Sequence, residues 1–204
     1  MNILVSPGNY NPLSFAHLRM FDIAKSRLRN VIGGVIHIDT VDSDYDKLKM
    51  VKDSIKNIDW LEAFDWETNI YPIKLYEVLE YYEKMFNTMA DKPNINGRYY
   101  FNTTNLKNVN VVLLCGIDYF VGFLRDCKVS DIKRVLNRGV VIMERDGYDI
   151  DDIFQEYEFL DEYKNKIIIC SDPVYKNIKQ EDIRYDDAFL TPMKRSDYEF
   201  KFYN

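Results

Sequence analysis

Short apolar segments recur along the chain and alternate with longer segments of mixed polarity. Six of them are strand-like and cover residues 2–6, 31–38, 60–63, 109–115, 139–143 and 166–170. The strongest are continuous runs of Val, Ile and Leu. A strand buried on both faces of a sheet has such a run, whereas a strand with one wet face alternates apolar and polar residues. The pattern therefore predicts buried, mostly parallel strands.

The segments between these strands carry apolar residues at helical spacing, over residues 17–29, 47–56, 72–89, 119–123 and 130–136. Strands that alternate with helices predict an α/β fold, with a doubly wound, Rossmann-like, mostly parallel sheet and helices on both faces. Ligands bind such sheets at the carboxyl ends of the strands. We expect one domain over residues 1–204, with a polar loop insertion at about 90–107 and a short divergent tail after about 185.

Composition narrows the class of protein. The 204 residues include 47% hydrophobic residues, the net charge is -6 and the sequence pI is about 5.1, which argues against a general nucleic-acid binder. No apolar run approaches the roughly 18–20 residues of a membrane helix. Cys115 and Cys170 lie in apolar runs and are interpreted as buried thiols of a reducing compartment. We expect a cytoplasmic protein without nucleic-acid or membrane partners; a nuclear location, the cytosol of a virus-infected host and homo-oligomerisation stay open.

The clearest chemical signal follows the first strand-like segment. Residues 8–21 are GNYNPLSFAHLRMF, so a turn with Gly and Pro leads from a strand into a helix. A helix start has unpaired backbone N–H groups and positive potential, and it therefore binds phosphates. His17, one of two histidines, falls in the opening turn. The spacing lacks the Gly-Lys-Ser/Thr of a Walker loop, and the structural alternative for His17 is a bond to a backbone group.

The spacing from Gly8 to Leu18 resembles the signature of the nucleotidylyltransferases, which move AMP or CMP from a nucleoside triphosphate to a phosphate acceptor. Further blocks are similar to nicotinamide mononucleotide (NMN) adenylyltransferases, closest to those of the eukaryotic type. They occur in family order as YDKLKM (45–50), WLEAFDWE (60–67), LLCGID (113–118), ERDGYD (144–149), DPV (172–174) and IR (183–184). The resemblance implies an enzyme that joins NMN to the AMP moiety of ATP, giving NAD⁺ and pyrophosphate; nicotinic acid mononucleotide is an open second acceptor.

The resemblance also implies a set of site residues. His17 and Arg184 would act catalytically on the ATP phosphates. Contacts to ATP are implied for Gly8, Asn9, Tyr10, Ser14, Gly116, Asp118 and Lys179. Trp66 would stack on the nicotinamide ring, and Glu67 belongs to the same subsite. Mg²⁺ is implied as the companion of the triphosphate, held by phosphate oxygens and water and not by a protein cage.

Each of these assignments has a structural alternative. Gly116 and Asp118 also fit a turn followed by a helix start. Trp66 fits a core position, and Arg184 fits an ion pair with a nearby aspartate.

Other singled-out residues are expected to be structural. Arg145 is expected to form a turn or an ion pair rather than touch a ligand, and His37 to be a packed histidine of its strand. The acidic run 149–152 fits a solvated face or a helix start, and the tyrosine-rich segment 76–82 fits core plus partner surface.

The chain departs from the family pattern near its end. Relatives carry Ile-Ser-Ser/Ala-Thr-x-x-Arg, whose hydroxyls cradle the triphosphate, whereas residues 178–184 here are IKQEDIR. Glu181 and Asp182 bring negative charge that Lys176 and Lys179 can offset. Two other functions therefore stay open. One is another adenylyl- or cytidylyltransferase, for example on phosphopantetheine. The other is a pyridine-nucleotide-binding protein with reduced or lost catalysis.

Overall fold

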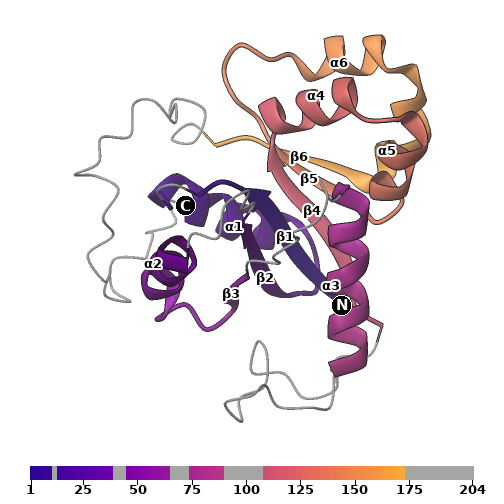
Figure 1. The fold of residues 1–204 in the computed structure, drawn as a ribbon. Coiled ribbons are helices and arrows are strands. Elements are labelled where there is room, and N and C mark those ends of the chain that lie inside the picture. Colours follow the sequence, from indigo (N-terminus) through magenta and orange to yellow (C-terminus); the bar gives the residue numbers. More distant parts are fainter. Residues whose placement is uncertain (11–12, 39–44, 65–73, 90–107, 173–204) are drawn as a thin grey trace.

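A six-stranded parallel sheet runs through the centre of the molecule (Figure 1). The computed structural model describes residues 1–10, 13–38, 45–64, 74–89 and 108–172. The strands are β1 (Asn2–Gly8), β2 (Val31–Ile38), β3 (Leu61–Phe64), β4 (Asn110–Gly116), β5 (Val140–Met143) and β6 (Ile167–Cys170). Their order is β3-β2-β1-β4-β5-β6, and every pairing is parallel. This is the order of doubly wound nucleotide-binding sheets, so the predicted fold class is confirmed.

Helices cover both faces of this sheet. They are α1 (Phe15–Arg27), α2 (Tyr45–Ile55), α3 (Leu75–Met89), α4 (Ile117–Asp126), α5 (Val129–Leu136), α6 (Ile150–Glu156) and the 3₁₀-helix η2 (Glu158–Lys166). One core cluster packs α1 and α2 against the sheet. The other packs α3, α4, α5, α6 and η2 against it. Neighbouring residues of β4 alternate between the two clusters: Val112 and Leu114 face the first, and Val111 and Leu113 face the second.

The apolar pattern located every strand and the first five helices, but it did not predict α6 and η2 as helices. The acidic run that was interpreted as a possible helix start does begin α6, because the Asp149 side chain accepts a hydrogen bond from the Asp151 N–H at 2.9 Å. Each of these two helices has a single buried residue, Ile153 in α6 and Leu160 in η2. One buried residue gives no helical period to detect. The predicted insertion at 90–107 and the tail after 185 lie outside the described residues.

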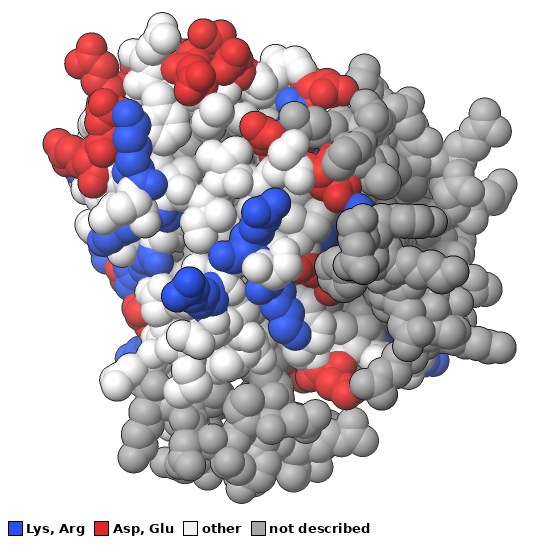
Figure 2. Space-filling model, turned by 180° about the vertical axis from the view of Figure 1, so that it is seen from behind, with Lys and Arg blue, Asp and Glu red and all other residues white. Residues whose placement is uncertain are grey.

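The negative charge of the protein is unevenly distributed. On the face seen in Figure 2, acidic side chains gather at the upper edge, on the side where Figure 1 places α6, whereas lysines and arginines occupy its middle. Asp149, Asp151 and Asp152 are exposed, so this run is also the predicted solvated face. No helix within the described ranges combines the length and apolar character that a bilayer crossing requires.

The prediction that Cys115 and Cys170 are buried thiols is confirmed. Cys115 in β4 and Cys170 in β6 are buried free thiols, and Cys127 is free and exposed. Burial raises the pKa of Cys115 far above its ordinary value, so this thiol stays protonated.

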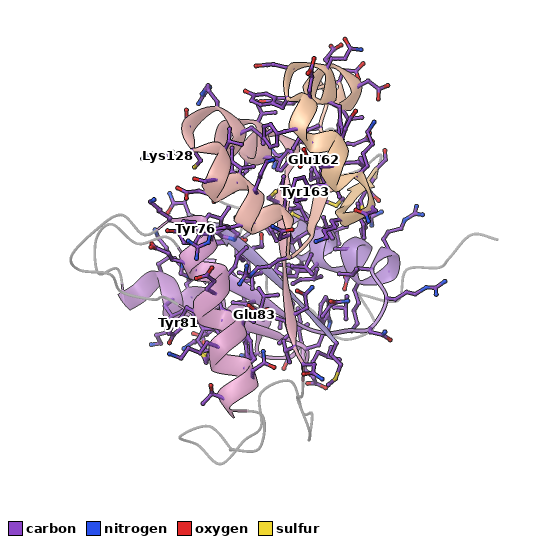
Figure 3. All side chains as sticks on the ribbon, turned by 90° about the vertical axis from the view of Figure 1, so that its right-hand side faces the viewer. Tyr76, Tyr81, Glu83, Lys128, Glu162 and Tyr163 are labelled. Carbon is purple, nitrogen blue, oxygen red and sulfur yellow. The ribbon has the colours of Figure 1, made fainter. Side chains whose placement is uncertain are left out.

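The tyrosine-rich helix α3 packs against α5 (Figure 3). Tyr82 is fully buried and Tyr76 is 9% exposed, whereas Tyr81 is 38% exposed. The guanidinium of Arg138 lies 2.8 Å from a Glu83 carboxylate oxygen, which ties α3 to the end of α5. The core part of the prediction for residues 76–82 is therefore confirmed, while the partner surface stays a prediction.

Gly34 of β2 allows α1 to approach the sheet. A Cβ at this position would lie 2.6 Å from Leu61 Cδ2 and 2.8 Å from the Phe21 ring, both in the core. We expect Gly34→Ala to lower the free energy of unfolding by about 1–3 kcal/mol, because an overpacked core must shift its neighbours. Urea unfolding measures this. Gly122→Ala is the matched control because a Cβ there meets no atom within 4 Å; a loss as large as that of Gly34→Ala would contradict the steric explanation.

His37 is the packed histidine that the sequence predicted. His37 is 4% exposed, and its Nδ1 lies 2.9 Å from the hydroxyl oxygen of Tyr82. Burial lowers the pKa of His37 from 6.5 to about 4. Between these two values the unfolded chain binds a proton that the folded chain does not, so His37 makes folding less stable as the pH falls through this window.

We therefore expect the unfolding free energy to fall by up to about 3 kcal/mol from His37 between pH 6.5 and pH 4. Replacement by Gln removes the titrating ring and keeps hydrogen-bonding capacity. The pH slope of His37→Gln should be smaller than that of the natural protein over this window. Equal slopes in thermal unfolding at matched ionic strength would show that His37 is not responsible.

The sheet order reverses its winding direction between β1 and β4. From β1 the chain winds outward to β2 and β3, and from β4 it winds outward to β5 and β6. The pairing of β1 with β4 extends to Val5 and Leu113, and each strand continues to a glycine, Gly8 and Gly116. The loops after these strands leave in opposite directions, so this edge is where a ligand binds in such folds.

Candidate active site

The loop after β1 holds Tyr10 in an uncommon backbone conformation. Tyr10 has φ +44°, in the left-handed region that a non-glycine residue rarely adopts. Its buried side chain reaches back to β1, where the hydroxyl lies 2.8 Å from the Ser6 carbonyl oxygen and 2.6 Å from Ser6 Oγ. These hydrogen bonds hold the turn. A non-glycine residue with positive φ is strained, and such backbone strain is typical of functional sites. The backbone at Tyr10 is therefore held in one conformation.

His17 faces back toward the start of α1. Its Nδ1 accepts a hydrogen bond from the Ser14 backbone N–H at 2.9 Å and lies 2.8 Å from Ser14 Oγ. The structural alternative for His17 is thus observed: the ring satisfies one of the unpaired donors of the helix start. It does not conflict with a chemical role, because an Nδ1 that accepts leaves the proton of the neutral ring on Nε2, which remains a donor.

The environment of His17 keeps the ring neutral. Burial, and secondly the positive charge of Arg145, lower the pKa of His17 from 6.5 to about 4. The Tyr10 ring packs edge-on against the imidazole, with 5.0 Å between centroids. At neutral pH His17 is therefore a hydrogen-bond donor held in one orientation, and not a cation.

Asn9 lies beside Lys47, which the sequence did not indicate as a site residue. Lys47 Nζ of α2 donates to Asn9 Oδ1 at 2.6 Å. Lys47 belongs to the YDKLKM block, so the signal was present, but a lysine in a helix is usually a solvated residue. The fold brings its positive charge to the loop after β1, where phosphates are expected.

The second half of the site lies at the ends of β4 and β5. Gly116 is the N-cap of α4 and Asp118 lies in the first turn of that helix, so the structural alternative for both is observed as well. Asp118 Oδ2 is 3.1 Å from Arg145 Nη1, with side chains 40% and 23% exposed respectively. The expectation that Arg145 forms an ion pair is confirmed. Its effect on the pKa of His17 also shows that the two halves of the site share one electrostatic environment.

Arg19 makes a second connection across the site edge. Its Nε and Nη2 donate to the two carboxylate oxygens of Asp172 at 2.9 and 2.6 Å. This two-pronged pair joins α1 to the residues after β6, and Asp172 is only 7% exposed. Both residues lie in sequence motifs, but no local pattern pairs them because they are 153 positions apart.

Four predicted site residues lie outside the described part of the chain: Trp66, Glu67, Lys179 and Arg184. The others lie at the carboxyl ends of β1 and β4 or at the start of the helices that follow, where the sequence analysis expected them. Among the described residues there is no group of three or more His, Cys, Asp or Glu side chains that could hold a metal ion. These residues do not form a cage for Mg²⁺, and we derive no step through a protein-bound ion.

A doubly wound sheet whose first strand leads through a turn into a helix start that holds a neutral histidine is the architecture expected of a nucleotide-binding protein. The sequence matches the cytidylyltransferase-like family over residues 5–184, and the chain belongs to this family.

Similar proteins come from a plant, an animal and Plasmodium falciparum. The chain is 25% identical to a nicotinamide/nicotinic acid mononucleotide adenylyltransferase of Arabidopsis thaliana, over 89% of this chain and 78% of the plant protein. It is 25% identical to enzyme 1 of the same name from Bos taurus, with the same coverages. Its fold matches that of the Plasmodium falciparum nicotinic acid mononucleotide adenylyltransferase complexed with NaAD, with a TM-score of 0.59, 16% identity and coverage of 87% of this chain and 80% of that one.

Proposed function

We propose that this protein is an adenylyltransferase that joins NMN to the AMP moiety of ATP, forming NAD⁺ and pyrophosphate, and that nicotinic acid mononucleotide is its second acceptor. The observation that carries the proposal is the neutral His17 at the start of α1, held by Ser14 beside the turn of Tyr10. The relatives named for this reaction, which match more than four-fifths of the chain, support the choice of acceptor.

The reaction needs no covalent enzyme intermediate. A phosphate oxygen of the mononucleotide attacks the α-phosphorus of ATP, a new P–O bond forms, and the bond to the β-phosphate breaks as pyrophosphate leaves in line. The protein contributes by holding the two phosphates in contact and by stabilising the charge that develops on their oxygens.

His17 supplies that stabilisation from the β1 side. Its neutral Nε2–H donates to an ATP phosphate oxygen, and the backbone N–H groups around Gly8, Asn9 and Tyr10 donate to neighbouring oxygens. Ser14 stands where relatives carry His or Thr, and its hydroxyl contributes a further donor. The positive end of the α1 dipole acts in the same direction. The negative charge of the bound phosphates favours the protonated ring and therefore raises the pKa of His17 when ATP binds.

The adenosine is held from the β4 side. The absence of a side chain at Gly116 lets the nucleoside lie against the end of β4, and the Asp118 carboxylate accepts from the ribose hydroxyls. The Asp118 side chain is 40% exposed and therefore accessible to a ligand.

The remaining contacts rest on the family resemblance. Trp66 stacks on the nicotinamide ring with Glu67 beside it, and Lys179 and Arg184 hold the β- and γ-phosphates in place of the lost hydroxyl motif. Mg²⁺ would be held by phosphate oxygens of ATP and by water, and it would supply charge neutralisation for the pyrophosphate.

One observation favours a second candidate. The IKQEDIR sequence at 178–184 lacks the hydroxyls of the family motif and carries two acidic residues. Loss of the phosphate-binding hydroxyls is expected in a protein that binds pyridine nucleotides without turnover. This hypothesis predicts saturable binding of NAD⁺ or NMN by calorimetry with no release of pyrophosphate.

The deciding experiment supplies ATP and Mg²⁺ with NMN, nicotinic acid mononucleotide or phosphopantetheine in separate reactions, and separates the products by chromatography. A dinucleotide from a pyridine mononucleotide supports the proposal, and Trp66→Ala should then raise the KM for NMN while leaving that for ATP unchanged. Product from phosphopantetheine alone would assign a different acceptor. Absence of any product together with NAD⁺ binding would support the binding protein.

A further inference from the structure

Arg145 and Asp118 lie at matching positions just beyond the ends of two neighbouring strands, β5 and β4. Gly116 of β4 is paired with Met143 of β5, and Asp118 and Arg145 each lie two residues beyond that pair. The backbone before Arg145 is held by a hydrogen bond from the Glu144 N–H to the Cys170 carbonyl of β6, at 2.9 Å. The guanidinium therefore emerges from a fixed backbone at the sheet edge that carries the proposed site.

The ion pair uses only part of the Asp118 carboxylate. Arg145 Nη1 lies 3.1 Å from Oδ2, and each carboxylate oxygen has two lone pairs. Within the described ranges, Arg145 is the partner found for this carboxylate. Oδ1 therefore keeps its capacity to accept from a ligand, and the pair restricts how the side chain can rotate.

The exposure of the pair argues against a role in stability alone. The Asp118 side chain is 40% exposed, so water partly screens the pair, and ion pairs that reach solvent contribute little to folding. Arg145 follows a fixed strand end and contacts the carboxylate that is proposed to bind the ribose. These are the features of a side chain that orients a ligand-binding side chain.

We propose that Arg145 is the positioning residue of the adenosine subsite, holding the Asp118 carboxylate in the orientation that accepts from the ribose hydroxyls. This inference rests on the proposed function for the identity of the nucleotide, but it concerns binding and not turnover.

The test compares ATP with 2′,3′-dideoxy-ATP, which lacks the ribose hydroxyls. Binding of both is measured by calorimetry for the natural protein, Arg145→Lys, Arg145→Met, Asp118→Asn and the Asp118→Asn/Arg145→Met double variant. We expect Arg145→Met to weaken ATP about 10–100-fold, the range for a lost hydrogen bond to a charged group, and to leave the dideoxy nucleotide nearly unchanged. Arg145→Lys should recover part of the discrimination.

The double variant should bind ATP no more weakly than Asp118→Asn, because Arg145 acts through that carboxylate. Arg125→Met is the matched control. It removes an arginine from the exposed pair with Asp126 at the end of α4, and it should change neither affinity.

Several outcomes would overturn the inference. Equal weakening of both nucleotides by Arg145→Met would mean that Arg145 acts on the phosphates or on the fold, and additive losses in the double variant would show that it does not act through Asp118. Failure of the natural protein to distinguish the two nucleotides would overturn it as well. Binding with the expected discrimination but no turnover would reject only the proposed function.

Discussion

Replacing His17 by Asn is expected to lower kcat/KM by about 10²–10³-fold, equivalent to about 3–4 kcal/mol of transition-state stabilisation. Asn has an acceptor oxygen at the position of Nδ1, so it keeps the bond from the Ser14 N–H, but it has no donor at the position of Nε2. The melting temperature should therefore remain near that of the natural protein while activity is lost. Steady-state kinetics and thermal unfolding on the same preparations separate the two effects.

Two further variants complete this test. His17→Ala loses both the donor and the acceptor, so it should lose activity to the same extent and also about 1 kcal/mol of stability, the usual cost of a lost helix cap. His17→Gln carries an amide donor near the position of Nε2 and should recover part of the rate. Full activity of His17→Asn would mean that the imidazole only closes the start of α1.

The protonation of His17 can be followed directly. Its pKa of about 4 in the free protein means that kcat/KM does not vary with titration of this ring between pH 6 and pH 8. Bound triphosphate should raise this pKa, which the NMR titration of the ring in the presence and absence of ATP measures.

Breaking the Arg19–Asp172 pair should cause the largest loss of stability. Asp172 is 7% exposed and receives two donors from Arg19, so Asp172→Asn leaves the half-buried guanidinium without the carboxylate to which it donates. We expect the free energy of unfolding to fall by about 2–4 kcal/mol, and the melting temperature by about 5–12 °C for a chain of this size. Thermal and urea unfolding measure both quantities.

The same variant has a functional consequence. Asp172 directly precedes the segment that contains Lys179 and Arg184, and the pair attaches the start of that segment to α1. If those residues hold the triphosphate, Asp172→Asn should raise the KM for ATP about 10-fold while the KM for NMN changes little.

An apolar replacement of both partners is the control. Arg19→Met with Asp172→Leu removes both charges, and such replacements of buried pairs are often nearly neutral for stability. Stability should therefore return while the defect in ATP binding remains. A double variant as unstable as Asp172→Asn would assign the loss to packing and not to an unpaired charge.

The sequence determined the architecture because its information is local. A buried parallel strand needs a continuous apolar run, and the runs around Val5, Val35 and Leu113 indicate such strands whatever their neighbours. The alternation with amphipathic helices then leaves few topologies other than a right-handed doubly wound sheet. The turn at Gly8 and the histidine of α1 could be located for the same reason, because the motif spans a single strand–loop–helix unit.

The tertiary structure decided everything that depends on partners distant in sequence. It brings Arg145 to Asp118, Lys47 to Asn9 and Arg19 to Asp172, none of which has a spacing that a local pattern can register. It also decided the charge of His17, since the burial and the nearby arginine that lower its pKa arise only when β1 and β5 lie in one sheet. A sequence specifies which groups are available, whereas their ionisation and orientation follow from the solvent that folding excludes and the charges that it brings together.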